Sequence, residues 1–357
     1  MIIHLFTTVT SYSTAFLQFM ERTSSLNDHW FVFGFGRSGA KNTVSPLVKS
    51  RTISLKTLPG IIQFFSLIYK NNHRLFFHYL PYDPTLFFWL FNHKIISKSV
   101  WILWGADLYG YQRKNESLRT RMYEFCRKRI IPWFPEIACF VKEDAELAKQ
   151  IYSSGAKYQQ ILYPLPVNLD HLRNTKNAEP SEVLHILAGN SADPFNQHLD
   201  LLDKLARFAD QDILVHCPLS YGGSAGYVSQ VIARGNQLFG NKFVPLTTVI
   251  QPQEYAGLLN KIHIAVMNHS RQQGLGNILS LLYMRKKIYI RSDITSFSFF
   301  KRNNCVVFDV FELESQSFEQ FSDVGFISDR NVQFVEEIVS DEFIAGNWKA
   351  LINKHLK

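Results

Sequence analysis

A cluster of hydrogen-bond donors follows an apolar stretch in the second half of the chain. Residues 263–268 (HIAVMN) predict a buried strand, and residues 274–284 predict a helix. Between these elements, and just inside the helix, lie one guanidinium, three amides and two glycines: Arg271, Gln272, Gln273, Gly274, Gly276 and Asn277. A guanidinium binds phosphate oxygens with a fork of N–H groups, and a helix N-terminus favours anions. The segment therefore predicts a cradle for a diphosphate and a sugar.

A second donor-rich turn follows the predicted strand over residues 183–189. Its candidate binding residues, together with two from the helix that comes next, are Gly189, Asn190, Ser191, Asn196 and His198. A glycine at the first position lets a backbone approach a ligand closely, and the following helix N-terminus attracts phosphate. A plain strand-to-helix turn, capped by Ser191 or Asp193, fits the same spacing. Both interpretations stay open from the sequence.

The first half of the chain offers two candidate general bases. Asp107 comes just after a predicted strand over 99–104, and His78 lies near the end of another over 74–80. A carboxylate or an imidazole at such a position can accept the proton of an acceptor hydroxyl. The structural alternatives are a turn aspartate and a hydrogen-bonded core histidine.

A predicted helix over residues 115–130 lies in a strongly basic part of the chain. Residues 113–133 hold seven Lys and Arg against two Glu. Leu118, Met122 and Phe125 form one apolar stripe, and most of the bases lie off it. Such a helix is typical of an anionic membrane surface, at roughly 1 kcal/mol per base; a solvated helix whose stripe faces the core is the alternative. The bases predicted to face the membrane are Arg119, Arg121, Arg127, Lys128 and Arg129.

Two further motifs suggest other chemistries but lack the context that these need. Residues 34–39 match G-x-G-x-x-G, yet no acidic residue occurs between Asp28 and Asp83 to bind a ribose. Asp210 and Asp212 form a D-x-D, as in metal-dependent sugar transferases, but they precede the next predicted strand instead of following one. We predict turns in both places. No His, Cys, Asp or Glu cluster has metal-ligand spacing, so we expect no metal and no cofactor.

The elements that must position these residues are short apolar strands alternating with helices. The strands predicted in the first half are 2–7, 29–33, 74–80, 99–104, 137–141 and 160–163. Those predicted in the second half are 183–189, 212–217, 247–250, 263–268, 287–290 and 305–308. This alternation predicts an α/β fold of two doubly wound, Rossmann-like domains that face a central cleft. Many nucleotide-sugar glycosyltransferases have that architecture, with ligands at the carboxyl ends of the strands.

A stretch without periodicity divides the chain. Residues 164–182 are rich in Pro and Asn, which is typical of a linker. The predicted parts are an N-terminal domain facing acceptor and membrane, a linker, a donor domain, and a C-terminal helix that packs back on the first domain: residues 1–165, 166–182, 183–340 and 341–357.

Length and charge support two domains with different partners. A chain of 357 residues exceeds what one hydrophobic core usually serves. Residues 1–178 hold 22 Lys and Arg against 11 Asp and Glu, whereas residues 179–357 hold 16 against 19. A basic half can face nucleic acid, a membrane or an anionic substrate. Four scattered cysteines fit a reducing cytosol, and no apolar run of about 18 residues can span a bilayer. The N-terminus has no basic n-region and no small-residue cleavage site, so we expect no signal peptide and a soluble or peripheral protein.

Taken together, these motifs resemble the bacterial 4-acetamido-4,6-dideoxygalactose (Fuc4NAc) transferase family of enterobacterial common antigen synthesis. The matching stretches are WGADLY, the region from His78 to PTL, GNSAD with the two polar residues after it, and RQQGLG, at residues 104–109, 78–86, 189–193 with 196 and 198, and 271–276. They occur in the family's order and span most of the chain. Asn277 replaces the small residue that the family often has after the second glycine of RQQGLG.

This resemblance implies a GT-B-type fold, a dTDP-sugar donor, a polyprenyl-diphosphate-linked acceptor and a peripheral place on the cytoplasmic face of the inner membrane. The glycines, amides and Arg271 of the two donor-rich segments would line the donor site, and Asp107 and His78 would face the acceptor. Tyr221, in a YGGSAGY stretch that departs from the family, is expected to pack on the base or sugar.

The sequence therefore predicts a metal-independent hexosyltransferase that acts on a Fuc4NAc-like sugar in surface polysaccharide synthesis. One alternative is a GT-B-type glycosyltransferase with a different nucleotide sugar, and another is a sugar-nucleotide epimerase of the same fold. A nucleic-acid-binding protein is disfavoured, because no recognisable module interleaves aromatic residues on a basic face. We expect no nucleic-acid partner.

Overall fold

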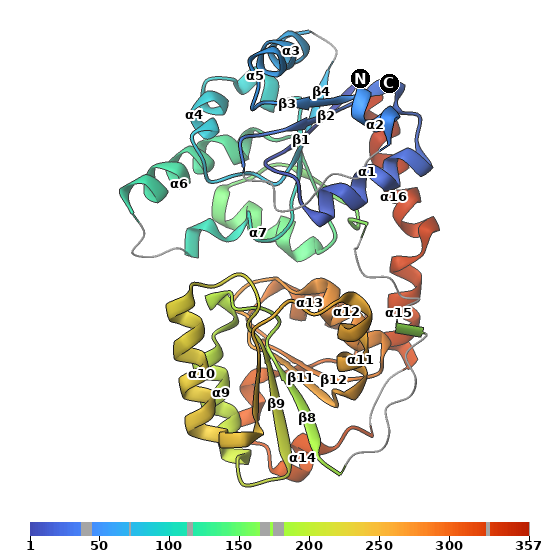
Figure 1. Cartoon of the computed structure of the whole chain (residues 1–357). Helices are drawn as coiled ribbons and strands as arrows, with labels where there is room; N and C mark the ends of the chain where they lie inside the picture. Colours follow the sequence, from blue (N-terminus) through green and yellow to red (C-terminus); the bar gives the residue numbers. More distant parts are fainter. Residues whose placement is uncertain are drawn as a thin grey trace. The chain divides into compact units, whose positions relative to one another are not determined.

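Two all-parallel sheets organise the chain, one in each of two compact units. The computed structural model describes residues 1–36, 45–70, 73–112, 117–164, 172–173, 182–325 and 329–356. Unit 1 comprises Met1–Pro166 and Ile338–Lys357, and unit 2 comprises Val167–Glu337 (Figure 1). The predicted linker lies almost entirely outside the described residues, as does the second part of the G-x-G-x-x-G match.

Unit 1 holds a seven-stranded sheet in the order β3-β2-β1-β4-β5-β6-β7. Its strands are β1 (Ile2–Phe6), β2 (His29–Phe33), β3 (Thr52–Ser54), β4 (Arg74–His78), β5 (Val100–Ile102), β6 (Glu136–Cys139) and β7 (Lys157–Gln160). Its helices are α1 (Ser11–Thr23), α2 (Pro46–Ser50), α3 (Leu58–Ile68), α4 (Thr85–Leu90), α5 (His93–Ile96), α6 (Leu118–Ile130), α7 (Lys142–Tyr152) and α16 (Asp341–Leu356). Helices α1 and α16 cover one face of the sheet, and α3 to α6 cover the other (Figure 1).

The last helix completes the core of unit 1. The Trp348 indole N–H of α16 donates to the Leu162 carbonyl at 2.9 Å. Glu136 of β6 accepts from the Lys354 ammonium at 2.8 Å and lies 3.1 Å from Nε2 of His355. Because Trp348 is 1% exposed, α16 supplies apolar area as well as hydrogen bonds to unit 1.

Unit 2 holds a six-stranded sheet in the order β10-β9-β8-β11-β12-β13. Its strands are β8 (Leu184–Ala188), β9 (Ile213–Pro218), β10 (Phe243–Leu246), β11 (Ile264–Met267), β12 (Lys287–Ile290) and β13 (Phe308–Asp309). The helices after the first strand are α9 (His198–Leu205), α10 (Ala225–Phe239), α11 (Pro252–Lys261), α12 (Leu275–Tyr283), α13 (Thr295–Arg302), α14 (Phe318–Ser322) and α15 (Asp329–Val339). Helices α9 and α10 cover one face, and α11 and α12 the other (Figure 1).

The predicted fold class, two doubly wound α/β units with parallel sheets, is confirmed. The predicted strand over 247–250 is wrong, because the pairing strand β10 lies just before it. β10 contains Pro245, which a sheet accepts at its edge but which weakens the strand pattern. β3 has only three residues, too few for a periodic signal. Among the described residues, no helix combines the length and the apolar character needed to cross a membrane.

Candidate functional site

The two donor-rich segments of unit 2 meet where the order of strands along its parallel sheet reverses. β8 and β11 are neighbours in the sheet although β9 and β10 lie between them in the chain, and Ala188 pairs with Val266 near their ends. The loops that follow these strands therefore leave the same carboxyl edge side by side. Such a switch point is where open α/β sheets bind ligands.

Two glycines let the loops at this edge pack closely against each other. Gly189 has φ +75°, and a Cβ there would lie 2.7 Å from the Asn196 Oδ1. Gly274 has φ +66°, and a Cβ there would lie 3.0 Å from the Asn190 side chain. Both positions need the left-handed backbone that glycine adopts without strain. The glycines thus let the Asn196 and Asn190 side chains lie against bare backbone.

Asn196 fixes the shape of the first loop from inside. Its Oδ1 accepts from the Asn190 backbone N–H at 3.0 Å, and its Nδ2 donates to the Asp193 carbonyl at 3.0 Å. The side chain is fully buried. The loop after β11 is tied to the same turn, since the Ser270 N–H donates to the Phe195 carbonyl at 2.9 Å. Hydrogen bonds within the protein therefore fix the conformation of both loops and of the polar groups that they carry.

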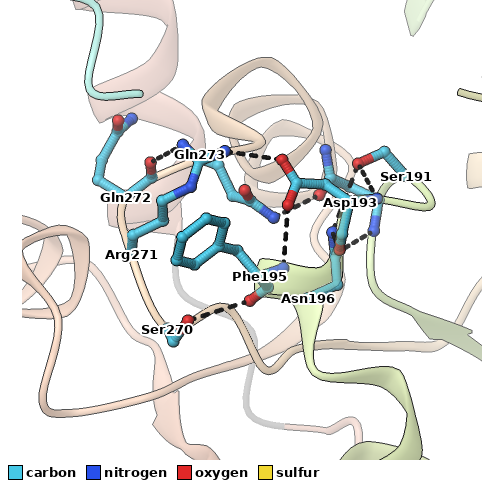
Figure 2. Close-up of polar contacts among 9 residues, drawn as sticks. Ser191, Asp193, Phe195, Asn196, Ser270, Arg271, Gln272 and Gln273 are labelled. Atoms are coloured by element: carbon cyan, nitrogen blue, oxygen red, sulfur yellow. Dashed lines mark hydrogen bonds and ion pairs between the residues drawn. The ribbon is translucent and has the colours of Figure 1, made fainter. Parts of the chain in front are cut away.

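Arg271 lies across the two loops (Figure 2). Its Nη2 donates to Asp193 Oδ2 at 2.8 Å, and its guanidinium stacks on the Phe195 ring with 4.8 Å to the centroid. Asp193 is itself held, because its Oδ1 accepts from the Phe195 N–H at 2.9 Å. Arg271 is 8% exposed. A planar cation fixed on an aromatic ring and one carboxylate still presents N–H groups to a diphosphate.

The remaining electrostatics of this edge favour an anion. Helix α12 begins after Gly274 without a side-chain cap, so its first N–H groups keep their partial positive charge. Burial lowers the pKa of His198 to about 4, and burial followed by the nearby Arg271 and His198 lowers the pKa of His269 to about 3. Both imidazoles are therefore neutral near pH 7. Nε2 of His198 has no hydrogen-bond partner among the described residues.

The structure brings most of the predicted donor-site residues to this one edge. Gln273 donates to the Asn190 side-chain oxygen at 3.4 Å, and Asn196 Nδ2 lies 3.4 Å from the Ser191 hydroxyl. Tyr221 is 58% exposed, and its hydroxyl lies 3.5 Å from the Asn190 carbonyl. The other predicted residues here, on the second loop and in the first turns of α9 and α12, are His198, Gln272, Gly276 and Asn277.

Three contributors were absent from the predicted set. Asp193 and Phe195 orient Arg271, and His269 lies buried beneath the second loop. Asp193 carried a signal, since it is an acidic residue in a donor-rich turn, but the same position also fits a helix cap. Phe195 resembles any core aromatic, so only the fold reveals that its ring supports a cation.

Asp107, predicted as a general base, is held within unit 1 in this structure, and its catalytic role stays a prediction. Its side chain is buried, and its oxygens accept from the Leu80 N–H at 3.0 Å, the Trp101 indole at 2.7 Å and the Trp104 N–H at 2.9 Å. Burial raises the pKa of this carboxyl, and those hydrogen bonds oppose the rise. The carboxylate closes the turn after β5 and does not reach solvent.

His78, the other predicted general base, is likewise held within unit 1. Its Nε2 lies 2.9 Å from Nδ1 of His4, and its Nδ1 lies 2.9 Å from the Tyr163 hydroxyl. The ring is 1% exposed and stacks on Phe6 with centroids 4.2 Å apart. Burial lowers the pKa of His78 well below its usual range. Both nitrogens are used within unit 1, so His78 is a core histidine.

Of the five bases of α6 that were predicted to face a membrane, one is buried and four are exposed. Arg127 is wrongly included: it is fully buried, its Nη1 donates to the Leu80 carbonyl at 2.6 Å, and its Nη2 donates to the Asp107 carbonyl. Its guanidinium also lies 4.4 Å from the Tyr82 ring centroid and 3.4 Å from a Glu124 oxygen. The other four bases are exposed, and so is the apolar stripe that the alternative placed in the core: Arg119, Arg121, Lys128, Arg129, Leu118, Met122 and Phe125.

The acidic D-x-D stands apart from the donor-rich edge. Asp210 and Asp212 precede β9, at the amino edge of the sheet, whereas the two loops lie at the carboxyl edge. In the part of the chain that the structure describes, no group of three or more His, Cys, Asp or Glu residues could hold a metal ion.

Solved structures share this architecture over the whole chain. Sucrose-phosphate synthase from Thermosynechococcus elongatus matches with TM-score 0.70 at 12% identity, covering 99% of this chain and 98% of that one. HepE from Anabaena, in complex with UDP and glucose, matches with TM-score 0.65 at 10% identity, covering 99% of each chain. WaaG, a glycosyltransferase involved in lipopolysaccharide biosynthesis, matches with TM-score 0.59 at 11% identity over 98% of each chain. The fold is thus that of the GT-B glycosyltransferases.

The family match gives this fold its activity. The chain belongs to the family described as 4-alpha-L-fucosyltransferase, glycosyl transferase group 56, which residues 60–332 match. It is therefore an enzyme of the hexosyltransferase class. The matched range covers the predicted RQQGLG and WGADLY stretches as well as the whole carboxyl edge of unit 2.

Proposed function

We propose that this enzyme transfers a Fuc4NAc-like acetamido-dideoxyhexose from a dTDP-sugar to a polyprenyl-diphosphate-linked saccharide, in the synthesis of a surface polysaccharide. The observation that carries the proposal is Arg271, held by Asp193 and Phe195 beside the uncapped N-terminus of α12 and two backbone glycines. The family match supports a fucose-type sugar. The choice of nucleotide, of 4-acetamido group and of lipid acceptor rests on the sequence resemblance.

The proposed chemistry places the donor diphosphate between Arg271 and the first turn of α12. Charge develops on the departing nucleotide as the bond to the anomeric carbon breaks. A buried guanidinium and oriented backbone N–H groups stabilise that charge without moving, and they do so most strongly where water is scarce. This device replaces a metal ion, so we propose a metal-independent transfer.

Neutral polar groups around the cation would bind the sugar. Asn190, Gln272 and Gln273 carry amides, which both donate and accept hydrogen bonds. Nε2 of His198 lies within the same edge, where a Cβ on Gly189 would be 3.1 Å away. Because the imidazole is neutral, it can serve a hydroxyl or an acetamido group without repelling Arg271.

The acceptor side of the proposal rests on unit 1. Four exposed bases of α6 flank an exposed apolar stripe, which fits a peripheral position on the anionic, cytoplasmic face of the bacterial inner membrane. A polyprenyl-linked acceptor resides in that membrane.

A donor screen followed by a transfer assay tests the proposal. Thermal unfolding is measured with dTDP-, UDP- and GDP-sugars for the natural chain and for Arg271→Ala. We expect a dTDP-sugar to raise the Tm of the natural chain and to leave the variant unchanged, since a ligand at 100 times its Kd stabilises by about 2.7 kcal/mol. Transfer to a polyprenyl-diphosphate disaccharide is then followed by mass spectrometry. A larger shift with another nucleotide contradicts the dTDP assignment, and no transfer with any donor contradicts the function.

A further inference from the structure

An apolar cavity lies in unit 1, apart from the donor edge of unit 2. Its volume is about 180 Å³. Aromatic and aliphatic side chains form most of its wall, among them Phe64 and Phe65 of α3, Phe77 of β4, Phe88 and Trp89 of α4, and Leu5 of β1. Phe35 and Phe65 also line it and are 57% and 37% exposed, so the cavity opens at the surface.

The position of the cavity is that of a ligand site. β1 and β4 are neighbours in the sheet although β2 and β3 lie between them in the chain, so the winding of unit 1 reverses there. Thr7, just after β1, and Tyr79, just after β4, both line the cavity. Open α/β sheets bind ligands at this kind of switch point. Tyr79 also has φ +83°, a strained backbone that bulky residues rarely adopt and that clusters at binding sites.

The chemistry of the wall selects a hydrocarbon. The carboxylate of Asp83, which lies at the cavity, is already bound to the Thr85 N–H at 2.9 Å and to the Thr85 hydroxyl. An engineered cavity of about 150 Å³ lined by Leu, Ile and Phe holds one benzene molecule. A cavity of 180 Å³ therefore has room for about one branched five-carbon isoprene unit.

The outer face of α3 continues the apolar surface from the cavity. Leu58, Ile62 and Tyr69 are 69%, 61% and 60% exposed, at the spacing of one helix face. The opposite face of the helix is apolar and buried, so this short helix carries large apolar side chains on both its buried and its exposed side. Lys56 and Lys70, both exposed, flank its two ends. Apolar contact bounded by positive charge complements an anionic lipid bilayer.

We infer that the cavity holds one isoprene unit of the acceptor lipid, close to its diphosphate, while α3 lies against the bilayer. This inference rests on the proposed function, because that function supplies an isoprenoid acceptor. An isoprene unit near the head group fits better than a whole bilayer acyl chain, since the cavity has a volume of only about 180 Å³ and lies at the carboxyl edge of the unit 1 sheet. A bound unit would anchor the acceptor from the chain side and leave its saccharide free.

Two neighbouring isoleucines give a matched test. Ile61 lines the cavity, whereas Ile62 points outward from the same helix. Binding of farnesyl diphosphate is measured by calorimetry for the natural chain, Ile61→Phe and Ile62→Phe. We expect Ile61→Phe to weaken binding at least about tenfold, because the larger ring occupies the space of the ligand. Ile62→Phe should bind like the natural chain.

Each other outcome overturns a defined part of the inference. Equal binding by all three chains removes the ligand from the cavity, even if the dTDP-sugar shift and its dependence on Arg271 persist. Dodecyl phosphate, bound as tightly as farnesyl diphosphate and equally sensitive to Ile61→Phe, overturns the isoprenoid in favour of an acyl chain. Loss of the donor shift with the Ile61 effect intact contradicts the proposed function and leaves a hydrocarbon site.

A measurement on the natural chain avoids any folding defect of a variant. Farnesyl diphosphate with a diazirine on one isoprene unit is photolysed in complex with the full chain, and the labelled peptides are identified by mass spectrometry. Labels within residues 55–65 or 77–89 support the cavity, because both segments line it. Labels confined to unit 2 overturn the inference.

Discussion

Units 1 and 2 share a sheet architecture but use their polar and apolar groups in opposite ways. Unit 1 holds 23 Lys and Arg against 12 Asp and Glu, and unit 2 holds 15 against 18. Of the large apolar side chains that are exposed in the described residues, thirteen lie in unit 1; the four in unit 2 are Leu199, Tyr221, Val249 and Phe311. Unit 1 presents a basic and apolar surface.

The carboxyl edges of the two sheets also differ in how their polar groups are placed. In unit 1, the groups that resemble catalysts, Asp107 and His78, are buried and bonded to their own unit. In unit 2, Arg271 and the imidazole of His198 lie in two loops that glycines let pack closely, and Nε2 of His198 has no hydrogen-bond partner among the described residues. The same sheet architecture therefore presents an edge of fixed hydrogen-bond donors in unit 2 and an apolar recess in unit 1.

Removing the cation of unit 2 has the largest expected effect. Arg271→Ala should lower donor turnover about a hundred- to a thousandfold, because one preorganised charge-stabilising donor is worth roughly 3–4 kcal/mol. Arg234→Ala is the control and should keep normal rates, because Arg234 of α10 pairs with Asp203 of α9 at a partly exposed position. Steady-state kinetics with saturating acceptor measure both. Normal turnover by Arg271→Ala would place the diphosphate elsewhere and erase the contrast between the units.

Neutralising the basic surface of unit 1 tests the other side of the comparison. Replacing the four exposed bases of α6 by Gln should release the enzyme from anionic liposomes, since each base contributes roughly 1 kcal/mol. The variant changes Arg119, Arg121, Lys128 and Arg129. Four exposed bases of unit 2, Lys261, Arg285, Lys301 and Arg302, give the control. Flotation assays at two salt concentrations measure retention, and unchanged flotation contradicts a docking role for α6.

The buried arginine of α6 should affect stability instead of membrane binding. Arg127→Leu leaves Glu124 and two buried carbonyls without their cationic partner, so we expect a loss of about 3 kcal/mol in the free energy of unfolding. Arg121→Leu on the exposed face should change it by less than about 0.5 kcal/mol. Urea titrations give both values. Similar values for the two variants would mean that Arg127 is not part of the core.

Adding a side chain at Gly189 of unit 2 should weaken donor binding more than it destabilises the fold. Gly189→Ala places a Cβ 2.7 Å from the Asn196 Oδ1 at a positive φ, so we expect about tenfold weaker nucleotide binding and up to about 2 kcal/mol of strain. Gly226→Ala is the matched control, because a Cβ there meets nothing within 4 Å. Calorimetry with the nucleotide compares the two, and equal affinity argues against close approach at Gly189.

Acid sensitivity is expected to be shared by both units and to be the smallest effect. Burial lowers the pKa of His269 to about 3 and that of His29 in unit 1 to about 4, against an ordinary value of 6.5. The unfolded chain therefore binds more protons below pH 6.5, and stability falls as the pH drops from 6.5 towards 4. One such histidine costs about 1 kcal/mol at pH 6. His269→Gln should flatten the pH dependence of urea unfolding, whereas a change of the exposed His93 to Gln should not.

The alternation of strands and helices predicted most of this fold because parallel strands are buried on both faces. Helix α10, for example, runs from Ala225 to Phe239 between Ser224 and Gly240, which are residue types typical of helix ends. The sequence also located the two loops rich in hydrogen-bond donors, because glycines and amides follow a predicted strand in each; that these loops bind the sugar donor stays a prediction.

The sequence could not show whether a given polar or apolar side chain is buried or exposed. Asp107 follows a strand, as catalytic carboxylates do, but only the fold shows three donors around it. The stripe of Leu118, Met122 and Phe125 has the same spacing whether it meets core or solvent. Arg127 lies on the same helix as the exposed bases and has the same charge as they do. Only the folded structure shows that Arg127 is buried.

The order of elements in unit 1 has a consequence for synthesis. Its core needs Trp348 and the other residues of α16, yet 171 residues of unit 2 are inserted before them. At about 5–20 residues per second, the ribosome takes roughly 10–35 seconds to make that insertion. Unit 2 is thus complete while the first 166 residues still wait for their last helix. During that interval Phe16 and His78 lack their contact with Trp348, so we expect a chaperone to bind the nascent chain at this exposed aromatic cluster.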